Sequence, residues 1–193
     1  MTLVLGGARS GKSAYAEGLI ESCPAPWLYL ATAQAFDDEM VARIAQHRAR
    51  RGEAWFTRDV PLALPEAITA AEGPVLVDCL TLWLTNLILT EADVAGATER
   101  LLAACAGARG PLVLVGNEVG LGIVPDNALA RRFRDAAGRL HQQLAARADR
   151  VVLTVAGLPL IVKPQATHPD ATHPDAAHPD APRLDAPRTG APA

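Results

Sequence analysis

Short apolar runs alternate with longer amphipathic stretches along the first 163 residues of the chain. The apolar runs predict strands, and the stretches between them, with apolar positions at helical spacing, predict helices. Strands that are apolar on both faces and alternate with helices are typical of a parallel sheet covered on both sides. The pattern therefore predicts an α/β fold in three layers, with a mostly parallel central sheet. The expected strands are Leu3–Leu5, Trp27–Ala31, Val75–Asp78, Leu112–Val115 and Val151–Val155, and the expected helices lie near 12–22, 37–51, 63–71, 80–90, 92–107 and 127–148.

The alternating pattern stops after Lys163. From Pro164 onward the chain reads PQATHPDATHPDAAHPDAPRLDAPRTGAPA, a five-residue repeat rich in Pro, Ala and Asp. Such a segment has almost no apolar surface to offset the entropy lost on ordering, so we expect a disordered tail over 164–193 and a single domain over 1–163. The regularly spaced histidines of the tail could bind a metal, but a flexible repeat fixes no coordination geometry, and a solvated tail is the favoured interpretation.

Charge and composition narrow the classes of function. The formal net charge is −3 and the pI is about 5.9, so the chain has no global basic field for nucleic acid or an anionic membrane. The three cysteines, Cys23, Cys79 and Cys105, are widely spaced, which argues against a disulfide framework or a zinc site and favours a cytoplasmic location. The N-terminal MTLVLGG lacks the basic region of a signal peptide, and no apolar stretch is long enough to span a bilayer.

A phosphate-binding loop follows the first expected strand. The segment GGARSGKS fits the pattern GxxxxGK followed by Ser or Thr, and it includes one of only two lysines in the chain. In such a loop, glycines let successive backbone N–H groups point at phosphate oxygens, the lysine reaches the β- and γ-phosphates, and the hydroxyl can ligate Mg²⁺. The residues predicted to bind a nucleotide here are Gly6, Gly7, Ala8, Arg9, Ser10, Gly11, Lys12 and Ser13.

Asp78 ends the apolar strand Val75–Asp78, as the acidic residue of a Walker B motif does. Such a carboxylate holds Mg²⁺ or orients a catalytic group. Two alternatives stay open: Asp78 could cap the helix that begins near Leu80, or it could accept hydrogen bonds from a guanine edge. Ser13 and Asp78 are the candidate magnesium ligands.

The expected helix 37–51 carries a candidate nucleophile. Its acids lie in the first turn and its arginines in the last, which suits the helix dipole. His47 continues the apolar face of Met40 and Ile44, and a histidine in that setting is usually structural. The arginines beside it favour another interpretation, because cationic neighbours keep the imidazole neutral and nucleophilic and guanidinium groups bind phosphate oxygens. We therefore predict that His47 accepts a phosphoryl or nucleotidyl group.

Two later segments give weaker signals. Residues 117–125, NEVGLGIVP, follow the strand Leu112–Val115, where α/β proteins place ligand-binding loops, and predict a wall on the substrate side. The next helix carries several arginines that read mostly as a solvated face, and its His141 is expected to be structural. Those arginines are Arg131, Arg132, Arg134 and Arg139.

Several segments in one order carry a family resemblance. They are GGARSGKS at 6–13, YLATA at 29–33, DDEM..RI..HR..R at 37–51, W.T at 55–57, VDCLTLWLTNL at 77–87, NEVG.GIVP at 117–125, FRD..G.L at 133–140 and AGLPL..K at 156–163. In this order the chain resembles the bifunctional adenosylcobinamide kinase/adenosylcobinamide-phosphate guanylyltransferase family of cobalamin biosynthesis. The resemblance covers essentially all of residues 2–163 and leaves only the tail outside.

The resemblance implies a RecA-like P-loop fold, a homotrimer and two consecutive reactions. The first phosphorylates adenosylcobinamide with ATP or GTP. The second forms a guanylyl-histidine from GTP, releases pyrophosphate and passes GMP to adenosylcobinamide phosphate, which gives adenosylcobinamide-GDP. By position in the motifs, His47 is the GMP acceptor and Lys12 the catalytic lysine. Further nucleotide contacts are implied at Ala31, Thr32, Ala33, Arg48, Ala49, Arg50, Arg51, Asp59 and Asp78.

The chain departs from the family pattern at a few positions. Aspartate stands at 59 and 78, where members often have glutamate, so side-chain reach differs there. Gly52 and Glu53 stand where the motif has a proline after its second arginine. The rival interpretations are a P-loop kinase with one activity, a RecA-type motor on nucleic acid, and a cobinamide-binding regulator without catalysis. The charge and the 4% aromatic content argue against the motor, and the intact GKS and His47 argue against the regulator.

Overall fold

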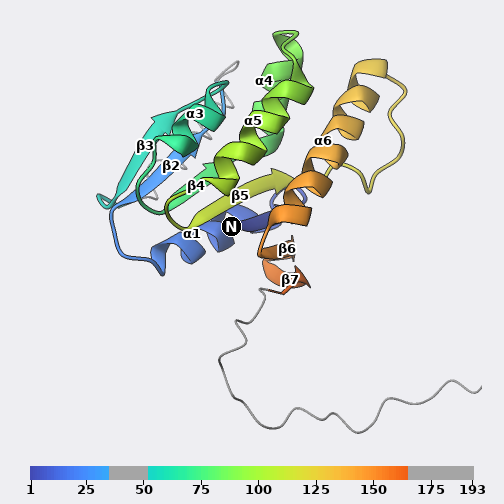
Figure 1. Ribbon diagram of the computed structural model, residues 1–193. Helices are drawn as coiled ribbons and strands as arrows, with labels where there is room; N and C mark the ends of the chain where they lie inside the picture. The colour runs from blue at the N-terminus through green and yellow to red at the C-terminus, as the bar shows by residue number, and fades with distance from the viewer. Residues whose placement is uncertain (35–51, 165–193) are drawn as a thin grey trace, which may run out of the picture.

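The computed structural model describes residues 1–34 and 52–164, and its central feature is a seven-stranded sheet (Figure 1). The strand order is β3-β2-β4-β5-β1-β6-β7. All neighbouring strands pair in parallel except β6 and β7, which are antiparallel. The strands are β1 (Thr2–Gly6), β2 (Trp27–Ala31), β3 (Trp55–Asp59), β4 (Val75–Asp78), β5 (Leu112–Asn117), β6 (Arg150–Val155) and β7 (Leu158–Lys163).

Helices cover both faces of this sheet. In Figure 1, α1 lies on one side, and the other helices lie on the opposite side. Successive residues of a strand therefore enter different cores: Leu3 packs in the cluster with α3 to α6, and Val4 in the cluster with α1. This confirms the predicted three-layer, mostly parallel fold. The helices are α1 (Lys12–Glu21), α3 (Leu64–Thr69), α4 (Leu80–Leu89), α5 (Val94–Ala106) and α6 (Ala128–Arg147).

The sequence analysis did not predict two of the strands, β3 and β7, and both lie at edges of the sheet. β3 reads WFTRD, with Trp55 buried and the next four residues exposed. β7 reads LPLIVK and is almost entirely exposed, although it is apolar. The helices pack over the central strands, so a strand at the edge need not be buried on both faces, and its sequence then lacks the signal of a buried strand. Pro159 is also compatible with an edge position, because proline donates no ladder hydrogen bond.

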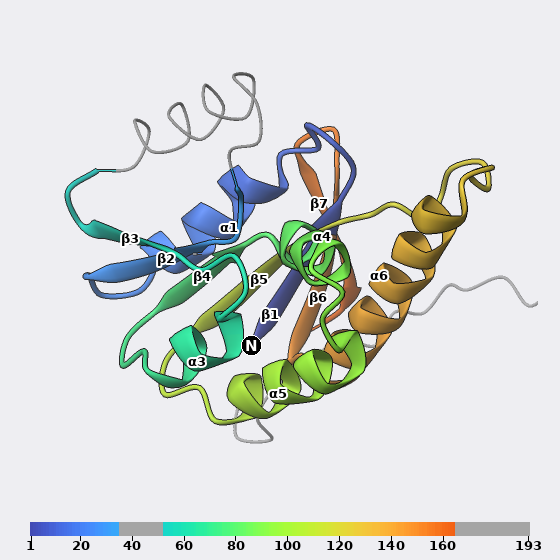
Figure 2. The same cartoon turned by 90° about the horizontal axis from the view of Figure 1, so that it is seen from above.

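The parallel register brings the ends of the strands to one edge of the sheet. Ala31 pairs with Asp59 on one side and with Asp78 on the other, and Gly6 pairs with Asn117 and Thr154. Figure 2 views the sheet with these strand ends and the first loop toward the upper part of the picture. The predicted helix 37–51 and the tail from residue 165 lie outside the described residues.

The buried face of α4 should carry much of the packing free energy. Trp83 is fully buried in the main core, and its indole N–H donates to the Leu62 carbonyl oxygen at 2.9 Å. We expect Trp83→Ala to lower the free energy of unfolding by about 3–5 kcal/mol, through lost burial and the remaining cavity. Leu89→Ala on the same helix, where the side chain is 58% exposed, is the control and should change it by less than about 0.5 kcal/mol. Chemical denaturation measures both, and equal losses would contradict the assigned packing.

Candidate nucleotide site

The phosphate loop connects β1 directly to α1. β1 ends at Gly6, α1 begins at Lys12, and Gly11 occupies the N-cap position with a φ of 91°. That conformation favours glycine, and a Cβ at Gly11 would lie only 3.0 Å from the Gly157 Cα. The N-cap of α1 makes no side-chain hydrogen bond among the described residues, and the first-turn N–H groups and the positive end of the helix dipole lie toward the loop. This arrangement suits a bound phosphate.

Residues of the β6–β7 hairpin hold the loop in place. The Ser10 hydroxyl is buried and lies 2.9 Å from the Thr154 hydroxyl, which donates to the Leu5 carbonyl oxygen at 3.1 Å. The Gly157 N–H donates to the Ser10 carbonyl oxygen at 2.9 Å. Ser10 therefore shapes the loop with its side chain. Thr154 and Gly157 were not among the predicted site residues: Thr154 lies in none of the quoted segments, and the segment at 156–163 that includes Gly157 carried only the family resemblance.

Lys12 and Ser13 occupy the first turn of α1, at the mouth of the loop. The Lys12 ammonium group donates to the Gly7 carbonyl oxygen at 3.1 Å, so it folds back over the loop. Gly7, Ala8 and Arg9 are exposed at the tip, and Lys12 and Ser13 are half-buried. The structure brings the positive charge, the loop N–H groups and a hydroxyl to one place.

Asp78 lies two strands away from β1, at the same edge of the sheet. The Tyr29 hydroxyl donates to its Oδ2 at 3.1 Å. The N-cap of α4 is Cys79, and no side chain makes a capping hydrogen bond there. The alternative in which Asp78 caps this helix is therefore wrong, and the carboxylate instead accepts from Tyr29 of the neighbouring strand β2.

A buried network holds the chain where β2 and β4 end. The Thr32 hydroxyl donates to the Cys79 carbonyl oxygen at 2.7 Å and accepts from the Cys79 N–H at 2.9 Å. The Asn86 amide donates to the Thr32 carbonyl oxygen at 2.9 Å. The Thr32 hydroxyl therefore stabilises the ends of β2 and β4, and the nucleotide contact predicted at Thr32 stays a prediction. Its neighbours Ala31 and Ala33 lie beside it at the same edge, and Asp59 lies exposed at the end of β3.

Cys79 is not a nucleophile in this setting. Burial, and next the Asp78 carboxylate, raise the pKa of the Cys79 thiol to about 11. The thiol is therefore neutral at pH 7, and its sulfur lies 3.0 Å from the Thr81 hydroxyl. Covalent chemistry, if the site performs it, requires another residue.

The proposed nucleophile and its arginines lie outside the described residues. These are His47, Arg48, Ala49, Arg50 and Arg51, which follow β2 in sequence and precede β3. Both strand ends that flank this segment, Ala31 and Trp55, belong to neighbouring strands of the sheet. The other candidate histidine, His141, is buried beside Gly116, as expected of a structural residue. Burial lowers the pKa of His141, and the nearby Glu118 carboxylate opposes that effect.

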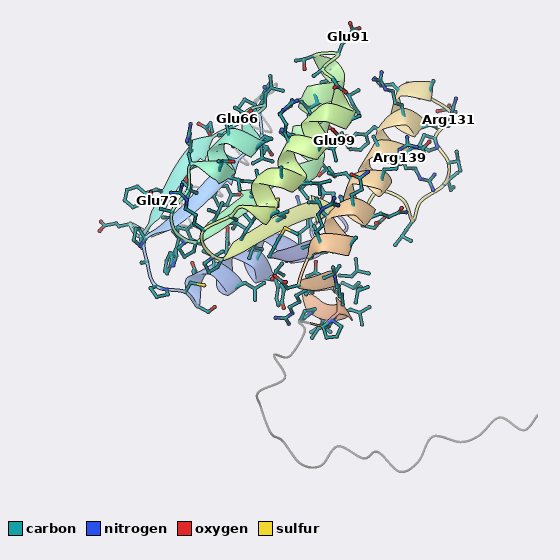
Figure 3. The ribbon with its side chains drawn as sticks, viewed as in Figure 1. Glu66, Glu72, Glu91, Glu99, Arg131 and Arg139 are labelled. Atoms are coloured by element: carbon teal, nitrogen blue, oxygen red, sulfur yellow. The ribbon has the colours of Figure 1, made fainter. Side chains whose placement is uncertain are left out.

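The arginines of α6 only partly match the expected solvated face. Arg132 and Arg139 are exposed and line a hollow together with Glu99 and other residues of α4 and α5, and Figure 3 labels Arg139 on the side of α6 that faces α5. Arg131 and Arg134 instead donate hydrogen bonds to carbonyl oxygens of the loop after β5. Sequence spacing alone does not reveal these contacts, because they depend on the path of that loop.

Comparison with known proteins identifies the family. The model of the family "Cobinamide kinase / cobinamide phosphate guanyltransferase" matches residues 2–162. The chain belongs to this family. The match spans the phosphate loop, the segment 35–51 and the loop after β5, and it ends just before the tail.

Curated members of the cobinamide kinase/guanyltransferase family are close in sequence. The "Bifunctional adenosylcobalamin biosynthesis protein CobP" of Pseudomonas aeruginosa is 51% identical over 166 residues, which cover 83% of this chain and 96% of that protein. The "Bifunctional adenosylcobalamin biosynthesis protein CobU" of Salmonella typhimurium is 44% identical over 181 residues, or 84% of this chain and 99% of that protein. Among solved structures, the RadB recombinase is 16% identical, with a TM-score of 0.45 over 79% of this chain and 72% of that one. The chain is an enzyme of cobalamin biosynthesis, as its motifs predicted.

Gly6 and Gly7 provide a paired test of the loop geometry. A Cβ at Gly6 would lie 2.4 Å from both the Ser10 and Thr154 hydroxyl oxygens and 2.8 Å from the Thr154 carbonyl oxygen, whereas a Cβ at Gly7 would meet nothing within 4 Å. We expect Gly6→Ala to lower the free energy of unfolding by about 1–3 kcal/mol, because the hairpin must move. Gly7→Ala should leave it nearly unchanged. Urea denaturation measures the stability of both variants. A Gly6→Ala variant as stable as the parent would contradict the close approach of Gly6 to Ser10 and Thr154.

Proposed function

We propose that residues 1–163 catalyse both reactions of the family on one nucleotide site. The chain phosphorylates adenosylcobinamide with ATP or GTP, and then transfers GMP from GTP to adenosylcobinamide phosphate to give adenosylcobinamide-GDP. The observation that carries this proposal is a complete phosphate loop at the carboxyl edge of the sheet, in a chain whose family match runs from residue 2 to 162. Both reactions are displacements at phosphorus, so one set of phosphate contacts serves both.

The kinase step uses the loop 6–13. The hydroxyl oxygen of the aminopropanol arm attacks the γ-phosphorus, the bond from this phosphorus to its bridging oxygen breaks, and the nucleoside diphosphate leaves with the electron pair. The hydroxyl proton passes to water. Lys12 and the N–H groups of the loop stabilise the charge on the phosphate oxygens, and fixed electrostatic contacts of this kind usually lower the barrier to phosphoryl transfer more than any other effect.

The side chains of Ser13 and Asp78 suit a magnesium ion. Mg²⁺ prefers oxygen ligands and is held by one or two protein groups together with phosphates and water. A hydroxyl and a carboxylate provide that donor set, and the described residues include no cluster of three or more His, Cys, Asp or Glu side chains for a metal. When bound, the ion neutralises charge on the phosphate oxygens. Tyr29 helps to fix the Asp78 carboxylate for this role, through its hydrogen bond to Oδ2.

The guanylyl step needs a nucleophile that the kinase step does not need. The neutral His47 imidazole attacks the α-phosphorus of GTP, the bond to the β-phosphate oxygen breaks, and pyrophosphate leaves with the electron pair. A phosphate oxygen of the acceptor then attacks the same phosphorus, and the P–N bond breaks to restore the imidazole. The proposed partners of the nucleotide in this step are Arg48, Ala49, Arg50 and Arg51, together with Ala31, Thr32, Ala33 and Asp59 at the strand ends.

We also propose that the enzyme is a cytoplasmic homotrimer. The edge strand β7 exposes Leu158, Leu160 and Ile161, and an apolar edge of this kind is typical of a surface covered by another subunit. All three cysteines are free thiols, which suits a reducing compartment. Among the described residues, no helix combines the length and the apolar character that crossing a membrane requires.

The two lysines of the chain provide a matched test of the kinase step. Lys12→Ala removes the ammonium group from the loop, and we expect the kcat of adenosylcobinamide phosphorylation to fall by roughly 10²–10³. Lys163→Ala removes the same charge from β7, where it donates to the Ala145 and Ala146 carbonyl oxygens, and should leave kcat within about twofold of the parent. A coupled assay of nucleoside diphosphate release measures both. Near-normal turnover of Lys12→Ala would overturn the assignment of the loop.

His47→Asn should separate the two reactions. We expect it to abolish both covalent labelling by α-labelled GTP and formation of adenosylcobinamide-GDP, while phosphorylation of adenosylcobinamide remains measurable. In the parent, the label should be acid-labile and alkali-stable, since it is a phosphoramidate. His168→Asn in the tail repeat is the control and should label normally. Labelling of His47→Asn at the parent rate would remove His47 from this role, and a parent that phosphorylates but never labels would be a kinase with one activity.

A further inference from the structure

Side-chain hydrogen bonds hold the backbone of the loop between β5 and α6 at several points. The Glu118 carboxylate accepts from the N–H groups of Gly120 and Leu121, the latter at 3.1 Å. The Arg134 guanidinium donates to the Gly120 carbonyl oxygen at 2.6 Å. Arg131, labelled in Figure 3 near the start of α6, donates to the carbonyl oxygens of Pro125 at 2.9 Å and of Asp126 at 2.5 Å. Polar groups of the loop and of α6 thus fix its path.

The apolar side chains of this loop are presented to solvent. Leu121 is 85% exposed, Ile123 is 97% exposed and Val124 is 65% exposed. The backbone that carries these side chains is held at both ends by the hydrogen bonds described above. The exposure of the side chains is therefore a feature of an ordered loop. Large apolar side chains that are grouped and exposed on a fixed loop are typical of a binding surface.

This apolar surface adjoins the nucleotide site. The loop leaves β5 at Asn117, which pairs with Gly6, and the Glu118 N–H donates to the Gly6 carbonyl oxygen at 3.0 Å. The segment therefore starts beside the first residue of the phosphate loop. In Figure 2 it runs outward from the end of β5 to the start of α6, at the same edge of the molecule as the phosphate loop.

We infer that Leu121, Ile123 and Val124 form an apolar wall that binds the corrin ring of the acceptor. The inference rests on the proposed function. The reacting hydroxyl or phosphate of the acceptor must reach the nucleotide on the loop 6–13, so the rest of this large molecule lies beyond the carboxyl edge of the sheet. The corrin ring carries many methyl groups, which match aliphatic side chains, and a wall fixed beforehand loses little conformational entropy on binding.

The proposed wall contacts the acceptor and not the nucleotide, so removing it should weaken binding of the acceptor alone. In the double variant Leu121→Ser/Ile123→Ser, we expect KM for adenosylcobinamide to rise by about tenfold or more, because the apolar contact of two side chains is lost. KM for ATP and labelling by α-labelled GTP should stay at the parent values. Equilibrium dialysis with cobinamide, followed by its visible absorbance, measures the Kd without turnover and should show the same rise.

The experiment also needs a control variant and a measurement of the number of subunits. Leu89→Ser alters an exposed leucine at the end of α4 and should leave every one of these quantities unchanged. An unchanged corrinoid Kd in the double variant would overturn the wall. A fall in subunit number by light scattering, together with loss of labelling, would also overturn it and make the loop an interface between copies. Failure of the parent to phosphorylate a corrinoid that it binds would overturn the proposed function and leave the wall standing.

Discussion

The parallel register between neighbouring strands is the constraint on which the site depends. Because β1, β2, β4 and β5 run in one direction, their last residues meet at a single edge, where Gly6 pairs with Asn117 and Ala31 pairs with Asp78. A shift of one residue in any of these pairs would move an alternating side chain to the other face of the sheet. The phosphate loop, the Asp78 carboxylate and the apolar loop after β5 are thus brought together by the backbone pairing of the strands that lead into them.

Much of the fold could be predicted because burial on both faces leaves a strong signal in the sequence. The strands β2 and β4 have the predicted bounds, and all five described helices begin within two residues of their predicted starts. The edge strands β3 and β7 could not be found in this way. Trp55 is the one buried residue of β3, and the apolar side chains of β7 are mostly exposed. At an edge, pairing with a neighbour determines the strand, and this pairing is a property of the whole sheet.

The candidate site also has one part that the sequence predicted and another part that it did not. The spacing of Gly6, Gly11 and Lys12 predicted the loop, since a phosphate imposes a local geometry that few sequences satisfy. Contacts between distant segments could not be predicted from spacing: the Tyr29 hydroxyl on Asp78, the Thr154 hydroxyl on Ser10, and the Thr32 hydroxyl on the backbone of Cys79. The structure also corrected one sequence interpretation, because the N-cap of α4 is Cys79 and not Asp78. The role of His47 rests on the family motif.

The hairpin that closes the sheet has a consequence for the thermodynamics of nucleotide binding. Thr154 and Gly157 hold Ser10 from one side, and the Gly6 carbonyl oxygen is held by the Glu118 N–H from the other. A loop fixed in this manner loses its conformational freedom when the protein folds, so little of that loss remains to oppose the ligand. The binding free energy of a triphosphate then comes chiefly from charge and hydrogen bonds.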